Sequence, residues 1–476
     1  MSTPTSFHGR PAAVVPCLLA MAAALLHGCA TPDIPAAQLP QPFAWVQMGA
    51  DGQAMARAAV AGSCPAITID GNARPMSLRA PAGTAPLRPS ASAPDGKAAN
   101  FPLAVCEATL PAGARDARIG DQPLPLPKAA PRRILVLGDS GCRMKRGAPF
   151  QDCNDPLAWP FASIAAMAAR FSPDLVIHVG DYHYRENPCP PGNAGCSGSP
   201  WGYGWDSWQA DFFAPAAPLL ARAPWVFLRG NHEECRRAGQ GWFRFLDPHP
   251  YRADRSCDDP AHDAGADHTE PYALPLDETT QLIVFDSARA GMRPLSSADA
   301  RFGVYRRQMQ KVAALAARPG MGTTVFASHH PVLAFHPEPG DPRPTGNLAL
   351  QSVLASLHGQ AYYPSGIQLA LHGHAHSFQA LSFASPHPAT IVSGNGGDNV
   401  DEALPDPLPP GLVPAPGTRI AGIAHHLRFG FLVMERGPEP AAPWTFTSHD
   451  GDGNRLVGCV QDGRALRCDR AGRVAP

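Results

Sequence analysis

From residue 132 onward, short uninterrupted hydrophobic runs alternate with longer stretches rich in Ala and Leu. Six runs have the length of strands: 134–137, 175–179, 225–228, 282–285, 324–327 and 368–371. Four stretches between them have the length and composition of helices: 158–170, 205–220, 298–317 and 347–357. Fully apolar strands are typical of sheets that are covered on both faces. The alternation therefore predicts an α/β fold, either a single sheet or α/β/β/α layers.

The two ends of the chain have a different pattern. Three later hydrophobic runs, 390–393, 429–435 and 444–447, are not followed by helices, so we expect them to complete a second sheet. Before residue 132, runs at 66–70 and 103–106 stand among turn residues. Residues 30–131 are therefore predicted to form a small all-β accessory region. A binding module is the alternative, but no cluster of functional side chains supports it.

Residues 1–29 have the pattern of a targeting segment. A short basic start with Arg10 precedes an apolar stretch, 12–26, which is too short and too interrupted by Pro16 for a transmembrane helix. It ends in Leu-His-Gly-Cys at 26–29, which resembles the lipobox of bacterial lipoproteins. The prediction is export to the bacterial envelope, periplasm or outer membrane, with a lipid anchor at Cys29. An ordinary secretory signal is the alternative.

The composition agrees with export. The chain has 476 residues with 55 Pro and 45 Gly, which indicates many loops, and its 12 Cys are unusual for a cytosolic protein. Cys17 and Cys29 fall in the targeting segment, and the other ten favour five disulfides. Sequence does not fix their connectivity, but spacing favours 64–106, 142–153, 189–196, 235–257 and 459–468. The 39 basic and 40 acidic residues nearly cancel, so no overall charge attracts nucleic acid.

Metal-ligating residues follow five of the predicted strands. The motifs are GDSG at 138–141, GDYHY at 180–184, GNHE at 230–233, HHP at 329–331 and GHAH at 373–376. Ligands gather at the carboxyl ends of strands in open α/β sheets, so these residues are expected to converge. Each motif alone is more often a turn or a loop. Their occurrence in order, each after an apolar run, favours a shared site.

The donor types indicate the kind of site. Carboxylates, imidazoles and one carboxamide suit zinc or other first-row metals more than calcium. The donors are too many for one ion. Two ions about 3.5–4 Å apart, bridged by a carboxylate, would form a centre that clamps a phosphoryl group.

The five motifs together resemble the calcineurin-like metallophosphoesterases, and within them the purple acid phosphatase branch. The resemblance covers roughly residues 132–435 and implies a layered α/β/β/α catalytic domain, which we extend to 132–476. Gly141 stands where many family members have a His ligand. The purple branch also lacks that His and uses a Tyr phenolate from the second motif, where this chain has Tyr184.

The resemblance also implies the role of each residue. One metal would be held by Asp139, Tyr184 and His376, the other by Asn231, His329 and His374, with Asp181 bridging. The implied ions are Fe(III) with Zn, Fe(II) or Mn, and a hydroxide between them would attack phosphorus.

Several other histidines lie beside these motifs. His232 would stabilise the phosphoryl oxygens or protonate the leaving oxygen. His183 would replace Tyr184 as ligand if the loop were rotated by one residue. His330 would contact a ligand, face the substrate or simply pack, and His178 and His372 are expected in the core. The loop Asn395-Gly396-Gly397-Asp398 resembles a family loop that closes near the metals.

The predicted function is therefore hydrolysis of phosphomonoesters, as in acid phosphatases. A phosphodiesterase or nucleotidase with the same metals is the first alternative, and an inactive metal-bearing envelope binding protein is the second. The expected partner is a small phosphorylated substrate, and no nucleic-acid module or protein partner is indicated. Aromatic residues at 201–205, between Cys189–Cys196 and the next helix, would line the substrate pocket or pack within their own loop.

Overall fold

The computed structural model describes residues 42–341, 343–439 and 442–470. The predicted targeting segment, with Cys17 and Cys29, lies outside these residues. Within them, no helix combines the length and the hydrophobicity that a membrane crossing needs.

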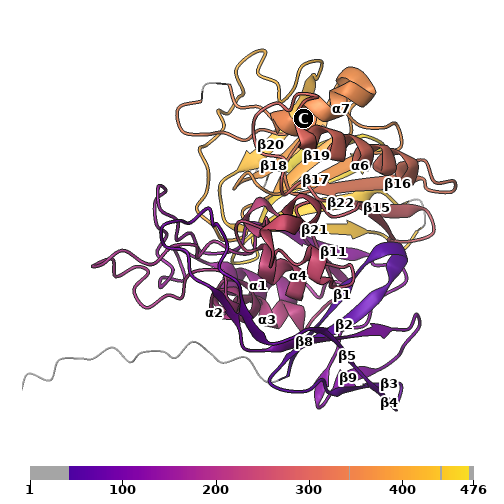
Figure 1. Cartoon of the computed structure of the whole chain (residues 1–476). Helices are drawn as coiled ribbons and strands as arrows, with labels where there is room; N and C mark the ends of the chain where they lie inside the picture. Colours follow the sequence, from indigo (N-terminus) through magenta and orange to yellow (C-terminus); the bar gives the residue numbers. More distant parts are fainter. Residues whose placement is uncertain (1–41, 342, 440–441, 471–476) are drawn as a thin grey trace, which may run out of the picture. The chain divides into compact units, whose positions relative to one another are not determined.

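Two large sheets form the frame of the described residues (Figure 1). The first has eleven strands in the order β24-β23-β22-β21-β11-β12-β13-β1-β2-β8-β5. Their bounds in chain order are β1 Phe43–Met48, β2 Ala54–Val60, β5 Ser77–Ala80, β8 Ala104–Leu110, β11 Arg133–Leu137, β12 Leu175–His178, β13 Trp225–Phe227, β21 Gly430–Arg436, β22 Trp444–Asp450, β23 Arg455–Asp462 and β24 Ala465–Arg470.

The second sheet has seven strands in the order β14-β15-β16-β17-β19-β18-β20. Their bounds are β14 Tyr272–Pro275, β15 Thr280–Phe285, β16 Thr323–Ser328, β17 Leu369–His372, β18 Phe378–Phe383, β19 Ala389–Ser393 and β20 Ile420–His426. Two small sheets complete the N-terminal part: β3 Ala66–Ile69, β4 Asn72–Pro75, β9 Ala117–Ile119 and β10 Gln122–Pro123 in one, β6 Gly83–Ala85 and β7 Ala99–Phe101 in the other.

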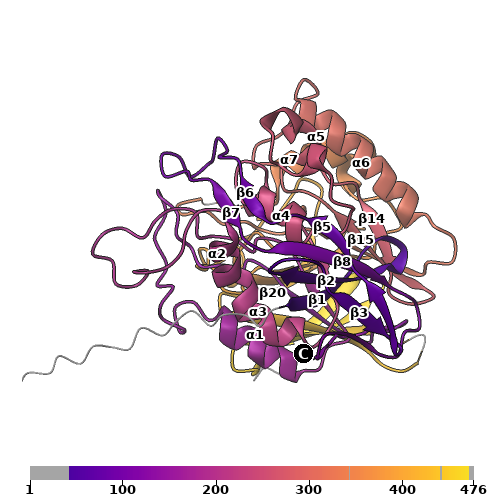
Figure 2. The ribbon, with the colours of Figure 1, turned by 60° about the horizontal axis from the view of Figure 1, so that its bottom comes forward.

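Helices cover the outer faces of the two sheets. Their bounds are α1 Phe161–Arg170, α2 Trp205–Trp208, α3 Ala214–Leu220, α4 Gly239–Phe245, α5 Asp263–Ala266, α6 Ala300–Ala316 and α7 Leu348–His358. The predicted helix 205–220 is α2, a π-helical turn at Gln209–Phe213 and α3 in direct succession. Figure 2 shows α1 and α3 on one side of the strands and α6 on the other.

The alternation of side chains along the strands produces three hydrophobic layers. Ile134 and Ile177 of the first sheet pack with Leu282 and Val325 of the second in the central core. The residues that alternate with these along each strand, such as Leu135, point outward to the helices. α1 shows the matching helical period, because Phe161, Ile164, Ala165 and Ala168 are all buried. The layers are α/β/β/α, which confirms the predicted fold class.

The late hydrophobic runs are divided between the sheets, so their predicted grouping was partly wrong. β19 lies in the second sheet as expected, but β21 and β22 extend the first. β21 pairs antiparallel with β11, with Val433 opposite Leu135. An antiparallel neighbour needs no crossover helix. The absence of a helix after these runs therefore did not indicate to which sheet each run belongs.

The N-terminal strands continue the first sheet. β1 pairs parallel with β13 at Gln47 and Trp225, and β2, β8 and β5 follow it outward. Two buried arginines fasten these strands to the end of α4 and to the segment that follows it. Arg79 of β5 donates to the carbonyl oxygens of Phe243, Arg244, Asp247 and His249, and Arg57 of β2 donates to those of Phe245 and Asp247. Loss of either arginine would leave buried carbonyl oxygens without hydrogen-bond donors, which would destabilise the fold.

The five disulfides are those that spacing favours. The structure contains Cys64–Cys106, Cys142–Cys153, Cys189–Cys196, Cys235–Cys257 and Cys459–Cys468. In the chain-entropy account, each typically stabilises the fold by about 2–4 kcal/mol, because it restricts the unfolded chain. Two of them, Cys142–Cys153 and Cys189–Cys196, pack in one small cluster beside the loops that follow β11 and β12.

Candidate metal centre

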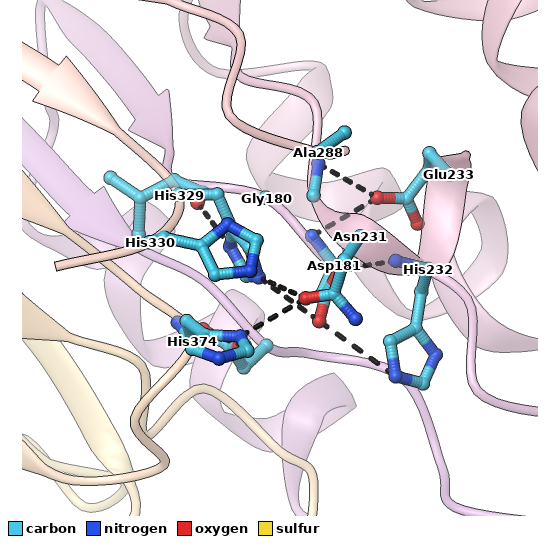
Figure 3. Close-up of polar contacts among 12 residues, drawn as sticks. Gly180, Asp181, Asn231, His232, Glu233, Ala288, His329, His330 and His374 are labelled. Atoms are coloured by element: carbon cyan, nitrogen blue, oxygen red, sulfur yellow. Dashed lines mark hydrogen bonds and ion pairs between the residues drawn. The ribbon is translucent and has the colours of Figure 1, made fainter. Parts of the chain in front are cut away.

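The five predicted motifs lie in loops that directly follow β11, β12, β13, β16 and β17. Figure 3 shows the loops after β12, β13, β16 and β17 meeting, and Asp139 of the first motif contacts Tyr184 and the His374 backbone. Three residues in them adopt the left-handed backbone region: Asp139, Asp181 and His374, with φ of 57°, 59° and 68°. Non-glycine residues seldom do so, and such strain gathers at functional sites. Gly230 allows the loop after β13 to approach Asp181 closely, because a Cβ at residue 230 would lie 2.0 Å from Asp181 Oδ1.

The phenol oxygen of Tyr184 is the centre of the first donor group. Tyr184 Oη lies 3.1 Å from Asp139 Oδ1, 3.0 Å from Asp181 Oδ2 and 3.1 Å from His376 Nε2. The Oη carries one hydrogen and faces three potential acceptors, so it can satisfy only one of them by donation. All four side chains belong to the residues predicted from sequence, and all are buried.

Asn231 lies at the centre of the second donor group. Its Oδ1 lies 3.1 Å from His329 Nε2 and 3.0 Å from His374 Nδ1. His329 Nε2 is also 3.1 Å from Asp181 Oδ2. Donor atoms of Asp181, His329 and His374 all lie within 4.8 Å of one another, a spacing that suits a metal ion. Figure 3 shows these side chains pointing toward one another. Asp181 is the residue that both groups share.

The hydrogen bonds of two of the three predicted ligand imidazoles fit metal binding. His376 Nδ1 lies 2.6 Å from the Asn399 carbonyl oxygen, and His329 Nδ1 lies 2.9 Å from that of Val179. A carbonyl accepts, so each Nδ1 carries the hydrogen and each Nε2 faces carboxylate oxygen. A neutral ring would present a lone pair to those oxygens, and a cation between them resolves the conflict.

The pKa shifts indicate the same need for positive charge. Burial raises the pKa of Asp139 to about 6. Although burial opposes it, Asp401 and Asp398 raise the pKa of His376 to about 10, and Asp181 raises that of His329 to about 9. The imidazoles are thus driven to carry a proton where a metal ion would otherwise supply the charge.

His232, the predicted catalytic residue, lies at the edge of the two groups. Its backbone N–H donates to Asp181 Oδ1 at 2.8 Å, and its ring packs against Tyr184 with centroids 3.9 Å apart and the ring planes tilted by 38°. Nδ1 lies 2.9 Å from the His183 carbonyl oxygen, whereas Nε2 is 3.9 Å from Asp181 Oδ2. Nε2 is therefore the ring nitrogen on the side of the donors, and it also lies 2.6 Å from Arg237 Nη2. Burial and then the Arg237 guanidinium lower the pKa of His232 to about 3.

The remaining histidines lie behind these donors. The His183 ring packs near Tyr203 and Trp208, while its neighbour Tyr184 reaches the first group. His178 is buried, stacks on Tyr182 and contacts Ser140 Oγ, and His372 is buried against Ser328. His330 is buried against Ser287, and its ring centroid is 4.1 Å from that of His374. It therefore contacts a predicted ligand.

Glu233, the last residue of the GNHE motif, organises the ligand loops. Its buried carboxylate accepts backbone N–H groups of Gly230, Asp181, Tyr182 and His183, at 2.9–3.3 Å. One side chain thus holds the turn after β12 against the turn after β13. Burial and the nearby Asp181 raise the pKa of Glu233 to about 8.

Two arginine–carboxylate pairs, one half-buried and one buried, flank the donors, and sequence reasoning missed both. Arg143 pairs with Asp398 of the predicted family loop, lies 3.5 Å from His376 Nδ1 and stands over the Tyr184 ring. Arg237 pairs with Glu186 and contacts the His232 ring. The members of each pair are distant in sequence, so only a charge close to a motif, such as Arg143 after GDSG, could have suggested them.

The N-terminal region contacts the residues around this centre. Tyr203 Oη lies 2.9 Å from Glu186 Oε2 and 3.1 Å from Ser90 Oγ. The predicted aromatic stretch is thus divided: Tyr203 supports Glu186, whereas Trp205 packs against Phe213 and Phe245 in the core. Asp95 pairs with Arg146, which follows the first motif by five residues.

Comparison with solved structures identifies the same architecture. A purple acid phosphatase from yellow lupin (Lupinus luteus) seeds superposes with a TM-score of 0.53 at 14% identity, over 90% of this chain and 73% of that chain. The structure of PhoD superposes with a TM-score of 0.54 at 12% identity, over 91% and 93%. At such identities the likeness concerns the fold. No curated protein sequence matched the chain.

The family follows from the sequence profile. The profile of the calcineurin-like phosphoesterases matches residues 132–378, which is more than half of the chain and includes all five motifs. The convergent carboxylates, imidazoles and carboxamide described above lie within that match. The chain therefore belongs to the calcineurin-like phosphoesterase family.

Proposed function

We propose that this phosphoric ester hydrolase cleaves phosphomonoesters at a centre of two metal ions. The observation that carries the proposal is that Asp181 belongs to two donor groups at once. Asp139, Tyr184 and His376 would hold one ion, and Asn231, His329 and His374 the other, with Asp181 between them. Two carboxylates and a phenolate suit a trivalent ion, and neutral donors suit a divalent one. Fe(III) with Zn, Fe(II) or Mn is the pair that we propose.

When bound, the ions supply Lewis acidity and an activated water at neutral or acidic pH. The chain itself orients the substrate. His232 Nε2 faces the donors and would hold or pass a proton at a substrate oxygen. Arg237, in contact with His232, and Arg143, over the Tyr184 ring, place two guanidinium groups where phosphoryl charge would collect.

The test of this function is turnover of an aryl phosphate by the metal-loaded protein. We expect hydrolysis that a chelator abolishes and that iron with zinc restores, because the donors are fixed by the fold but the charge comes from the ions. The same preparation should cleave the bis-aryl diester more slowly. Rates on both esters, together with metal content, provide the measurement.

The alternatives have distinct outcomes in that experiment. Faster cleavage of the diester would favour a phosphodiesterase. A protein that holds two metals and cleaves neither ester would favour an envelope binding protein, and the proposed hydrolysis would then be wrong.

We also propose that the protein is exported and lipid-anchored at Cys29 in the bacterial envelope. Five disulfides among the described residues support an oxidising compartment. In a bacterial host, the wild type should fractionate with membranes and need detergent for release. The Cys29→Ala variant should not carry the lipid. A wild type that is soluble without detergent would contradict the anchor.

A further inference from the structure

Lys145 differs from the other lysines of the chain. Lysine occurs at four positions, and three of them form ion pairs: Lys97 with Asp206, Lys128 with Asp174 and Lys311 with Glu270. The Lys145 side chain makes no hydrogen bond or ion pair with any other described residue, and the residue is half-buried. Placing an ammonium in a half-buried position without a partner is unfavourable, so the position calls for an explanation.

The backbone places Lys145 on the same side as Arg143. Between them, Met144 forms a β-bridge with Arg185 and its side chain is fully buried. Side chains alternate across such an extended segment, so residues 143 and 145 share the face opposite to Met144. On that face Arg143 reaches Asp398, His376 and the Tyr184 ring. Backbone bonds from Met144 to Tyr184 and from Glu186 to Met144 hold this segment against the loop after β12.

The charges around Lys145 leave it as the uncompensated cation. Arg143 is paired with Asp398, and Arg237 is paired with Glu186. The pKa of Lys145 is lowered, first by Arg237 and then by burial, while Glu186 and Asp181 act in the opposite direction. Each neighbouring guanidinium thus already has a carboxylate partner, whereas the Lys145 ammonium has none. An incoming anion would supply that partner.

We propose that Lys145 binds a non-bridging oxygen of the substrate's reacting phosphoryl group and selects doubly charged monoesters over singly charged diesters. The inference rests on the proposed function and names a specificity determinant for it. Near neutral pH a phosphomonoester carries nearly two negative charges, because its second pKa is about 6. A diester has one charge and one more esterified oxygen. A third cation beside two compensated arginines therefore favours the monoester.

Binding of inorganic phosphate tests this role without turnover. Calorimetric titration of the metal-loaded protein should give a dissociation constant that rises about 10- to 100-fold in Lys145→Gln, as expected for loss of a hydrogen bond between charged groups. Lys145→Arg should restore most of the affinity. Dimethyl phosphate, which has a single charge, should bind nearly equally to wild type and variant. Lys311→Gln, a change of the same chemistry at an exposed position of α6, is the matched control.

Turnover provides the second readout. In Lys145→Gln, kcat/KM should fall about 10- to 100-fold on an aryl phosphate and less than about threefold on the bis-aryl diester. Unchanged phosphate affinity, or equal losses on both esters, would overturn the proposal. A wild type that cleaves no ester would contradict the proposed function instead, and the phosphate titration would still decide the role of Lys145.

Discussion

Replacing Asp181 by Asn is expected to reduce hydrolysis of an aryl phosphate by about 1,000-fold or more, which corresponds to about 4 kcal/mol of transition-state stabilisation. Asp181 Oδ2 contacts Tyr184 and His329, and Oδ1 accepts the His232 N–H. An amide has no negative charge, and its nitrogen cannot accept a hydrogen bond. Both donor groups therefore lose their shared ligand. The measurement is kcat/KM together with metal content by elemental analysis, and we expect fewer than two ions per chain.

A matched control is Asp121→Asn, the same chemical change at an exposed turn. It should retain wild-type activity and both metals. Thermal unfolding of both variants shows whether each remains folded. If Asp181→Asn binds two metals and keeps more than a tenth of the wild-type activity, Asp181 does not bridge the ions.

The second large effect is expected from Tyr184→Phe. In the iron-loaded wild type, a phenolate bound to Fe(III) should produce a charge-transfer band in the visible spectrum, and the variant should lose it. Tyr184 Oη is 3.0–3.1 Å from donor atoms of three other candidate ligands, so its loss should also lower activity by about 100-fold. The absorption spectrum at fixed iron content and kcat/KM are the two measurements.

Tyr182→Phe is a close control, because it removes another buried hydroxyl from the same loop. Tyr182 Oη donates to the Leu228 carbonyl at 2.8 Å and contacts neither donor group. That variant should keep the band and lose only about 1–3 kcal/mol of stability, because a buried carbonyl loses its donor. A band that survives in Tyr184→Phe, or an active iron-loaded wild type without one, would remove the tyrosinate ligand and the purple-branch comparison with it.

The catalytic sheets were predictable from sequence because their strands are continuously apolar. The predicted runs 134–137 and 324–327 are β11, Arg133–Leu137, and β16, Thr323–Ser328. The candidate ligands were predictable for a related reason. A residue such as Asp139 stands directly after its strand, so the strand end fixes where it lies, and parallel neighbours bring such ends together.

The arginine–carboxylate pairs and the neighbours of several strands could not be predicted, because they depend on residues that are distant in sequence. Nothing near Arg143 indicates Asp398, and nothing near Glu186 indicates Arg237. β21 and β22 were assigned to the other sheet, because an apolar run does not specify its neighbour. β2, with the sequence AMARAAV, has little of the β-branched composition that marks a strand, yet it is central among the N-terminal strands.

The pairing of β1 with β13 has a consequence for the order in which the protein folds. β1 begins at Phe43 and is made early, but its partner residue Trp225 lies beyond β11, β12 and the helices α1, α2 and α3. Until Trp225 is available, one edge of β1 has no partner, and closing so distant a contact slows folding. Meanwhile that edge is open to incorrect pairing. We therefore expect residues 43–130 to remain incompletely folded on a growing chain and to become stable together with the catalytic sheets.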